Sequence, residues 1–299
     1  MGDKEFLKKV LVPTDGSDSS LLAEEIAAIV AKKTGATVTA LHIIREVEEY
    51  YRLLYATQGL EHNIPHSIVK EILDLTEQEA NKIINDARAL FNKRGITVDT
   101  KILKGIDPAD SILEFSKKDY DLIVMGARGK NEKDPNALGS VTRKVIRHTR
   151  CPTLFVKKFC SLSNLLVCID GSENSIKALD YAIKLAEKFS PEITLLNVQE
   201  RRFRDLSPYA RAVSEKLSER ILSRALSAIG RDELKVDKRV EFGVVSDTII
   251  EVAERRDHDL IVLGSRGFGT VKRFMLGSIS DDVSHKAKRS VLMVPAKHE

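Results

Sequence analysis

Apolar positions along the chain alternate between short continuous runs and longer stretches with helical spacing. In the first half, Val10–Val12 is an apolar run closed by a proline, and Leu122–Met125 is the kind of run found in strands buried on both faces. Residues 17–34 and 67–94 instead place apolar side chains at helical intervals, and each stretch ends before a glycine. This alternation predicts a parallel sheet with helices on both faces.

The other predicted elements of the first half are strands over 38–44, 97–103 and 153–156 and helices over 108–117 and 138–148. The second half follows the same order. Ligands of such sheets bind beyond the carboxyl ends of the strands, where the strand order reverses. The loops after strands one, two and four therefore carry the candidate chemistry.

The two halves repeat each other in sequence. Residues 10–17 read VLVPTDGS and residues 165–172 read LLVCIDGS, while DYDLIVMGARG at 119–129 parallels DHDLIVLGSRG at 257–267. We therefore predict two α/β domains, copy one over 1–158 and copy two over 159–299. The offset falls from 155 at Asp15/Asp170 to 138 at Gly126/Gly264, so copy one carries 17 extra residues, mostly around 45–66.

A glycine pattern follows the fourth strand of each copy. Two glycines are separated by two residues, and nine further residues separate the second from a glycine and a serine. The residues are Gly126, Gly129, Gly139 and Ser140 in copy one and Gly264, Gly267, Gly277 and Ser278 in copy two. Glycines let a backbone approach phosphate closely, and a helix N-terminus favours an anion. Both serines could cap the helix that follows or contact a phosphate. The chain has no GxxxxGK[ST] or GxGxxG motif.

The glycine spacing, the DLIV(M/L)G strand before it and the (V/P)xDGS loop near each start resemble the universal stress protein family. The resemblance covers nearly the whole chain twice. It implies an ATP-binding, doubly wound five-stranded parallel sheet of order 3-2-1-4-5 in each copy, the fold of the adenine nucleotide α-hydrolases. It also implies that domains pair through their last strands.

The resemblance further implies a nucleotide site in each copy. The aspartates would lie near adenine and ribose, and the apolar residues would surround adenine. The glycines, and the two residues that follow the third glycine of each copy, would hold the phosphates. The implied residues are Pro13, Thr14, Asp15, Ile43, Met125, Gly126, Arg128, Gly129, Gly139, Ser140 and Val141, then Cys168, Ile169, Asp170, Val198, Leu263, Gly264, Arg266, Gly267, Gly277, Ser278 and Ile279. Two alternatives to ligand contact stay open. Asp15 and Asp170 could cap the adjoining helices, and Arg128 and Arg266 could be exposed to solvent without contacting phosphate.

The two copies depart from the family pattern at different places. Copy two has Cys168 and Ile169 in place of the family-like Pro-Thr pair, so the adenine end is more typical in copy one. In the nine-residue bridge, copy one has two acids, Glu132 and Asp134, whereas copy two has Lys272 and Arg273. We expect copy two to bind phosphate better, by at least about tenfold in affinity.

Composition narrows the function classes. The net charge is +4 and the charges are interspersed, a pattern that does not favour nucleic-acid binding. The chain has no run of about 18 apolar residues, so no membrane span is predicted. Residues 1–5 lead into the first strand without the apolar region of a signal peptide. Cys151, Cys160 and Cys168 form no CxxC pair, so we expect a reduced, cytoplasmic setting.

The insertion offers two further candidates. His62 and His66 have the spacing of metal ligands on a helix, but no third ligand is evident and Pro65 interrupts the helix, so we expect no metal there. An apolar and aromatic cluster over 50–55 favours packing against a neighbouring domain or subunit rather than a cofactor.

We therefore expect a regulatory, stress-related ATP-binding protein with little or no turnover, because no placed base or nucleophile accompanies the glycines. The alternatives are a slow ATPase or nucleotidyl-transfer enzyme, with Mg²⁺ held mainly by phosphates, and a scaffold without nucleotide. The last strands, 153–156 and 291–294, are expected to cover each other as a pseudo-dimer within the chain. A homodimer through the insertion is left open.

Overall fold

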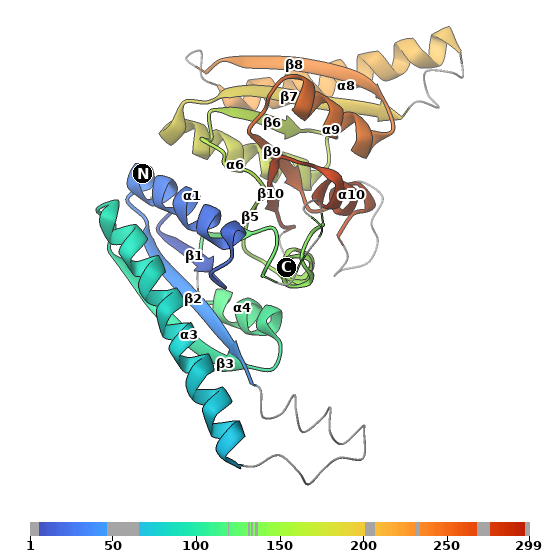
Figure 1. Ribbon diagram of the computed structural model, residues 1–299. Helices are drawn as coiled ribbons and strands as arrows, with labels where there is room; N and C mark the ends of the chain where they lie inside the picture. The colour runs from blue at the N-terminus through green and yellow to red at the C-terminus, as the bar shows by residue number, and fades with distance from the viewer. Residues whose placement is uncertain are drawn as a thin grey trace, which may run out of the picture.

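The computed structural model describes residues 6–46, 66–118, 120–130, 132, 134, 137–200, 207–230, 234–267 and 276–296. Figure 1 shows two α/β halves that meet at β5 and β10. Copy one consists of β1 (Lys9–Pro13), α1 (Asp18–Thr34), β2 (Thr37–Arg45), α3 (His66–Lys93), β3 (Val98–Gly105), α4 (Pro108–Ser116), β4 (Leu122–Gly126), α5 (Ser140–His148) and β5 (Thr153–Val156). Copy two consists of β6 (Asn164–Cys168), α6 (Glu173–Phe189), β7 (Glu192–Glu200), α8 (Pro208–Ile229), β8 (Val236–Gly243), α9 (Val245–Arg255), β9 (Leu260–Gly264), α10 (Ser278–Lys286) and β10 (Ser290–Val294).

Local sequence signals set the ends of the first helix in each copy. Ser17 caps α1 by accepting a hydrogen bond from the amide of Ser20, and Gly35 ends it in the left-handed region at φ +78°. Ser172 caps α6 in the same way through Ser175. The predicted bounds of α1 are confirmed, and a serine provides the cap of each of the two helices.

The ten strands of the described residues form one sheet, of order β3-β2-β1-β4-β5-β10-β9-β6-β7-β8. Each half is parallel throughout and has the predicted order 3-2-1-4-5, so the predicted fold class is confirmed. The two halves join where β5 and β10 pair antiparallel, with Leu154 opposite Leu292. Neither last strand therefore leaves an unpaired edge. Beside this seam, Lys157 Nζ donates to the carbonyls of His285 and Ala287 at the end of α10, at 3.0 and 2.7 Å.

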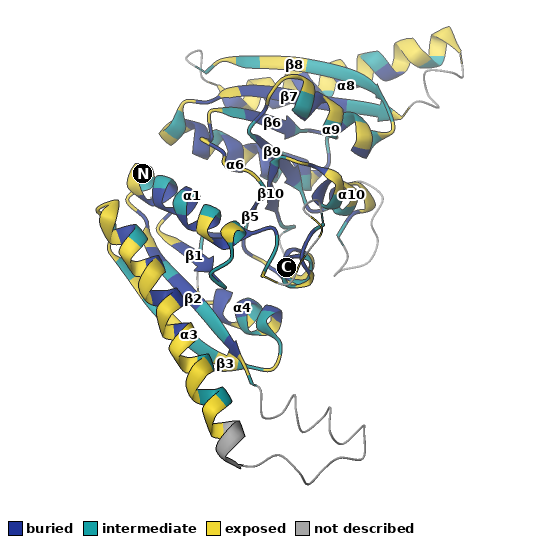
Figure 2. Cartoon of the chain, in the orientation of Figure 1, coloured by how far each residue is buried: buried dark blue, intermediate teal, exposed yellow. Residues whose placement is uncertain are grey.

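The helices cover both faces of the sheet and enclose two apolar layers. One layer joins α1, α3, α6 and α8 and contains Ile26 and Leu179, one from each copy. The other joins α4, α5, α9 and α10 and contains Ile112 and Val283. Figure 2 shows this buried interior along the strands, with exposed residues on the outer helix faces. Each layer spans both copies, so the halves share their hydrophobic core.

Copy one is longer than copy two mainly between its second strand and the helix that follows. Twenty residues (46–65) separate β2 from α3, whereas seven (201–207) separate β7 from α8. Helix α3 has 28 residues and α8 has 22. The aromatic cluster over 50–55 lies outside the described residues. In the described part of the chain, no helix is long and apolar enough to cross a membrane.

Candidate functional site

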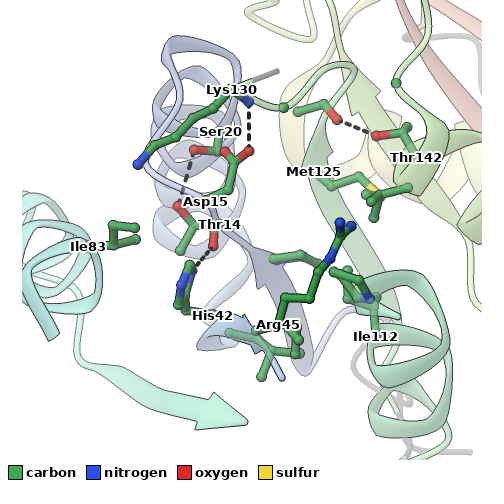
Figure 3. Close-up of a pocket in the computed structure, with 18 of the residues that line it drawn as sticks. Thr14, Asp15, Ser20, His42, Arg45, Ile83, Ile112, Met125, Lys130 and Thr142 are labelled. Atoms are coloured by element: carbon green, nitrogen blue, oxygen red, sulfur yellow. Dashed lines mark hydrogen bonds between the residues drawn. The ribbon is translucent and has the colours of Figure 1, made fainter. Parts of the chain in front are cut away.

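The loop after β1 is anchored at the carboxyl edge of the sheet to strand β2 and to the loop after β4 (Figure 3). The amide of Thr14 donates to the carbonyl of Leu41 at 2.9 Å, and Thr14 O lies 2.7 Å from His42 Nδ1. Asp15 accepts from the amide of Ser17 through Oδ1 and from the amide of Lys130 through Oδ2, both at 3.0 Å. Asp15 therefore ties the first loop to the glycine loop after β4, and it does not cap α1.

The glycines after β4 are required by this close packing. A Cβ added at Gly129 would lie 2.7 Å from Asp15 Oδ2, and one at Gly126 would lie 2.8 Å from the backbone carbon of Ser19. In copy two a Cβ at Gly267 would lie 2.6 Å from Asp170 Oδ2. Part of the glycine pattern is thus explained by contact between two loops of the same site.

Helices α5 and α10 begin at the glycine-serine pairs without a side-chain cap. Gly139 and Gly277 occupy the cap positions with ψ of 149° and 145°, so Ser140 and Ser278 are the first helical residues. Of the two roles left open for these serines, the structure contradicts the capping role, because a cap must precede the first helical residue. Thr142 Oγ1 donates to Gly126 O at 2.8 Å and holds the start of α5 against the end of β4.

Copy one has a continuous cavity of about 460 Å³ at the strand ends. All eleven residues predicted for this copy line it: Pro13, Thr14, Asp15, Ile43, Met125, Gly126, Arg128, Gly129, Gly139, Ser140 and Val141. Glu132, one of the two acids expected to repel phosphate, also lines the cavity. Asp134 contacts the same loop, because its amide donates to Glu132 Oε1 at 3.2 Å and its carbonyl accepts from Arg128.

In copy two the corresponding space is divided. The predicted residues line two cavities, of about 80 and 720 Å³. The smaller one alone is lined by Cys168, Ile169, Leu263, Gly264 and Arg266, and the larger one alone by Gly277 and Ser278. Both are lined by Asp170, Val198, Gly267 and Ile279. The smaller cavity is the predicted adenine end, where Cys168 and Ile169 replace the family-like pair. Lys272 and Arg273, on which the charge comparison rests, lie outside the described residues.

Several lining residues of copy one were missed by the sequence reasoning. His42, Arg45 and Lys130 bring positive or titratable groups to the cavity, and Glu79 reaches it from α3. Lys130 Nζ donates to Glu79 at 2.6 Å, and this bond lowers the pKa of the Glu79 carboxyl. The helical spacing of Glu79 and Ile83 could have placed both on one face of α3, but only the fold shows that this face overhangs the site.

Different side chains hold the first loop in the two copies. In copy two Asn197 stands where copy one has His42, and its Nδ2 donates to Ile169 O at 2.6 Å. Asn197 Oδ1 in turn accepts from Ser218 Oγ and Gln199 Nε2, both at 2.8 Å. The carbonyl two residues before Gly16 or Gly171 is thus fixed in both copies by unlike chemistry.

The described residues contain no cluster of three His, Cys, Asp or Glu side chains suited to a metal. His62 and the side chain of His66 lie outside the described part. For an adenine nucleotide the fit is better: each copy joins an apolar cavity end to glycines that leave no room for a Cβ and to an uncapped helix N-terminus.

Comparisons with known proteins give one consistent result. The model of the universal stress protein family matches residues 7–157 and 162–295. A universal stress protein of Methanocaldococcus jannaschii is 38% identical over 156 residues, covering 52% of this chain and 85% of that protein. One from Synechocystis is 24% identical over 298 residues, covering 96% and 99%. The crystal structure of a universal stress protein from Archaeoglobus fulgidus aligns with a TM-score of 0.70 at 23% identity, over 96% of this chain and 98% of that one.

Proposed function

The chain belongs to the universal stress protein family, and from that premise we propose that it binds adenine nucleotide, ATP foremost, at two homologous sites as a stress-response regulator. One observation carries the proposal: in each copy an uncapped helix N-terminus opens onto a cavity at the carboxyl edge of a parallel sheet. Unpaired amide groups and the positive end of the helix dipole at such a position favour a phosphate group.

The orientation of the ligand follows from the polarity of the cavity. The apolar side chains of Ile43 and Met125 lie at one end in copy one, and Val198 and Leu263 hold the same positions in copy two. We assign this end to the adenine base. We assign the phosphates to the starts of α5 and α10, where Gly139 and Gly277 precede Ser140 and Ser278.

We propose little or no turnover, because the acids that line the cavity of copy one are already engaged. Both oxygens of Asp15 accept backbone hydrogen bonds, Glu79 accepts one from Lys130, and Glu132 accepts one from the amide of Asp134. A general base must be free to reach the attacking water. Mg²⁺ would enter bound to the phosphates of the nucleotide, whose oxygens are ligands it prefers.

We further propose that the domain boundary falls between residues 158 and 159, and that the two domains act as an intramolecular pseudo-dimer. The antiparallel pairing of β5 with β10 supports this arrangement. A homodimer through residues 45–66 remains a second level of assembly to test. The unpaired Cys151, Cys160 and Cys168 support a reducing, cytoplasmic location.

Two measurements test the function. Mass analysis of nucleotide released from denatured, freshly purified protein should identify an adenine nucleotide. Calorimetric titration should show two ATP sites per chain and at least about tenfold weaker GTP binding, since a base pocket discriminates through its polar contacts. Equal affinity for ATP and GTP would refute the adenine assignment. Multiple turnovers of phosphate release would favour the slow ATPase, and a chain that binds neither nucleotide would favour the scaffold.

A further inference from the structure

A glutamate lies buried beneath the first loop of copy one. Glu24 belongs to α1 and is only 1% exposed, next to core residues such as Ala23 and Ala27. Its Oε1 accepts a hydrogen bond from Thr14 Oγ1 at 2.6 Å. Its Oε2 is buried without a hydrogen-bond partner among the described residues. A carboxylate in this position lacks the several partners that an ionised group needs away from water.

The surroundings disfavour the ionised form of Glu24. Burial raises the pKa of its carboxyl to about 7, the hydrogen bond from Thr14 opposes this rise, and the negative charges of Asp86 on α3 and Asp15 in the first loop add to it. His42 on β2 also lies at this loop, through its bond to Thr14 O, and Lys130 contacts the loop through Asp15. The strands beneath present apolar side chains to the same layer, including Val124 and Val156.

The hydrogen bonds around Thr14 distinguish the two protonation states. Thr14 Oγ1 lies 2.6 Å from Glu24 Oε1 and 3.2 Å from Ser20 Oγ, but its hydroxyl has one hydrogen and can donate to only one of them. When Glu24 is ionised, that hydrogen must go to the carboxylate. When Glu24 is protonated, it donates to Thr14, Thr14 donates to Ser20, and Ser20 donates to Ser17 O at 2.9 Å.

Protonation therefore completes a chain of hydrogen bonds that ends in the cap of α1. The same chain touches the candidate site, because Thr14 and Ser20 line the cavity and the amide of Gly16 approaches Thr14 Oγ1 at 3.4 Å. Asp15 lies between Thr14 and Gly16 in the chain, and it holds the glycine loop by accepting a hydrogen bond from the amide of Lys130. A charge on Glu24 would thus act on a site that must also accept the negative charge of phosphates.

Copy two lacks this buried acid and the hydroxyl that binds it. Ile169 replaces Thr14, and Leu179 occupies the position of Glu24 on the matching helix, with exposures of 2% and 0%. The amide of Ser175 still donates to Ser172 Oγ at 3.2 Å and its hydroxyl to Ser172 O at 2.9 Å, so the helix cap itself is retained. Around the helix cap, the two copies therefore differ in the buried acid and its hydroxyl partner.

We propose that copy one takes up a proton on Glu24 when it binds its nucleotide, whereas copy two binds without this proton. The inference rests on the proposed function and adds a pH response to one of the two sites. The phosphates and the protonated carboxyl favour each other, since removing one negative charge from beneath the site stabilises the other.

A ligand-free measurement tests the first half of the inference. In ¹³C-labelled protein, the carboxyl resonance that disappears in Glu24→Gln should titrate close to neutral pH. A midpoint in the ordinary range of a glutamate, about 4 to 5, would overturn the inference before any nucleotide is added.

Binding measurements test the second half. In a Gly267→Asp/Gly277→Asp background, which leaves only copy one, ATP affinity should fall between pH 6 and pH 8 by about threefold to tenfold more in the wild type than in Glu24→Gln. Calorimetry in two buffers of different ionisation enthalpy should show proton uptake that the Gln variant lacks. The ionisation of ATP itself is common to both proteins and cancels. Glu24→Leu provides a second variant that matches the residue of copy two.

A matched control uses the other site. In a Gly129→Asp/Gly139→Asp background, Glu24→Gln should leave the pH dependence of ATP binding unchanged. Equal pH slopes for wild type and Glu24→Gln at copy one would overturn the inference while leaving nucleotide binding intact. Absence of ATP binding at every pH would overturn the proposed function itself, and this linkage with it.

Discussion

The two copies build the same backbone site and fill it with different side chains. In both, an aspartate follows the first strand, glycines follow the fourth, and a helix begins uncapped beside them. Yet Thr14 and Glu24 form a buried polar pair in copy one, where copy two has the buried apolar residues Ile169 and Leu179. The backbone features arise from how loops meet at a sheet edge, whereas the side chains beneath can change without moving the backbone.

The phosphate ends differ in charge as well. Helix α10 carries Asp281 in its first turn, whereas α5 has no acid in its first turn. An acid at this position favours the helix dipole but opposes a bound phosphate. Arg147 of copy one reaches across the seam and contacts both oxygens of Asp281 at 3.1 and 2.8 Å. Copy two thus depends on its partner domain to offset a charge beside its own site.

The largest expected difference concerns stability and pH. The folded-state pKa of Glu24, about 7, lies above its ordinary value of 4.5, so folding is favoured while the group is protonated. That contribution is complete below about pH 4.5 and is lost as pH rises through 7, a loss of about 3 kcal/mol. Glu24→Leu should remove this pH dependence, as measured by chemical denaturation between pH 5 and pH 8. A parallel loss of stability in both proteins would contradict the burial argument.

The second prediction concerns what the copies share. Gly126→Ala and Gly264→Ala should each cost about 2 kcal/mol of unfolding free energy, because the added Cβ would approach the backbone of the first helix. The closest carbons, of Ser19 and Asn174, would lie at 2.8 and 2.7 Å. Gly139→Ala is the milder control, since its Cβ would lie 3.3 Å from the nearest atom. A cost in one copy only would break the equivalence of the two loops.

The third prediction separates the sites in affinity. From the bridge charges we expect copy two to bind ATP at least about tenfold more tightly, a difference of about 1.4 kcal/mol. Gly267→Asp/Gly277→Asp should therefore reduce ATP affinity more than Gly129→Asp/Gly139→Asp does, in parallel calorimetric titrations. The divided cavity of copy two acts in the opposite direction. If Gly129→Asp/Gly139→Asp reduces ATP affinity more, the adenine end determines the difference in affinity more than the bridge charges do.

The smallest expected effect tests the contact between domains. Arg147→Ala should cost about 0.5 kcal/mol of stability, because the pair with Asp281 is partly exposed to solvent. It should also weaken ATP binding at copy two about twofold, with copy one unchanged. Asp281→Asn in the same background should restore the affinity of copy two. Failure of that rescue would show that the arginine acts other than through this charge.

Much of the fold could be predicted from sequence, because its signals are local. Glycines that end α1 and α3, the proline-opened α4 and the apolar run of β4 each mark an element through its own residues. The repeat provided some of these signals twice, and the resemblance to the universal stress protein family implied the strand order of both halves. The eleven residues predicted for copy one all line one cavity, because the carboxyl ends of parallel strands meet at one edge.

The sequence by itself determined the two copies, their order of elements and the loops that form each site, since periodicity and turn residues act over a few positions. Only the tertiary structure decided that Asp15 binds the amide of Lys130, 115 residues away, and that Glu24 lies under Thr14. It also decided that Arg147 faces Asp281 across the seam. Such pairs depend on how α1, β4 and the two halves pack, and packing between distant segments leaves no periodic trace in a single chain.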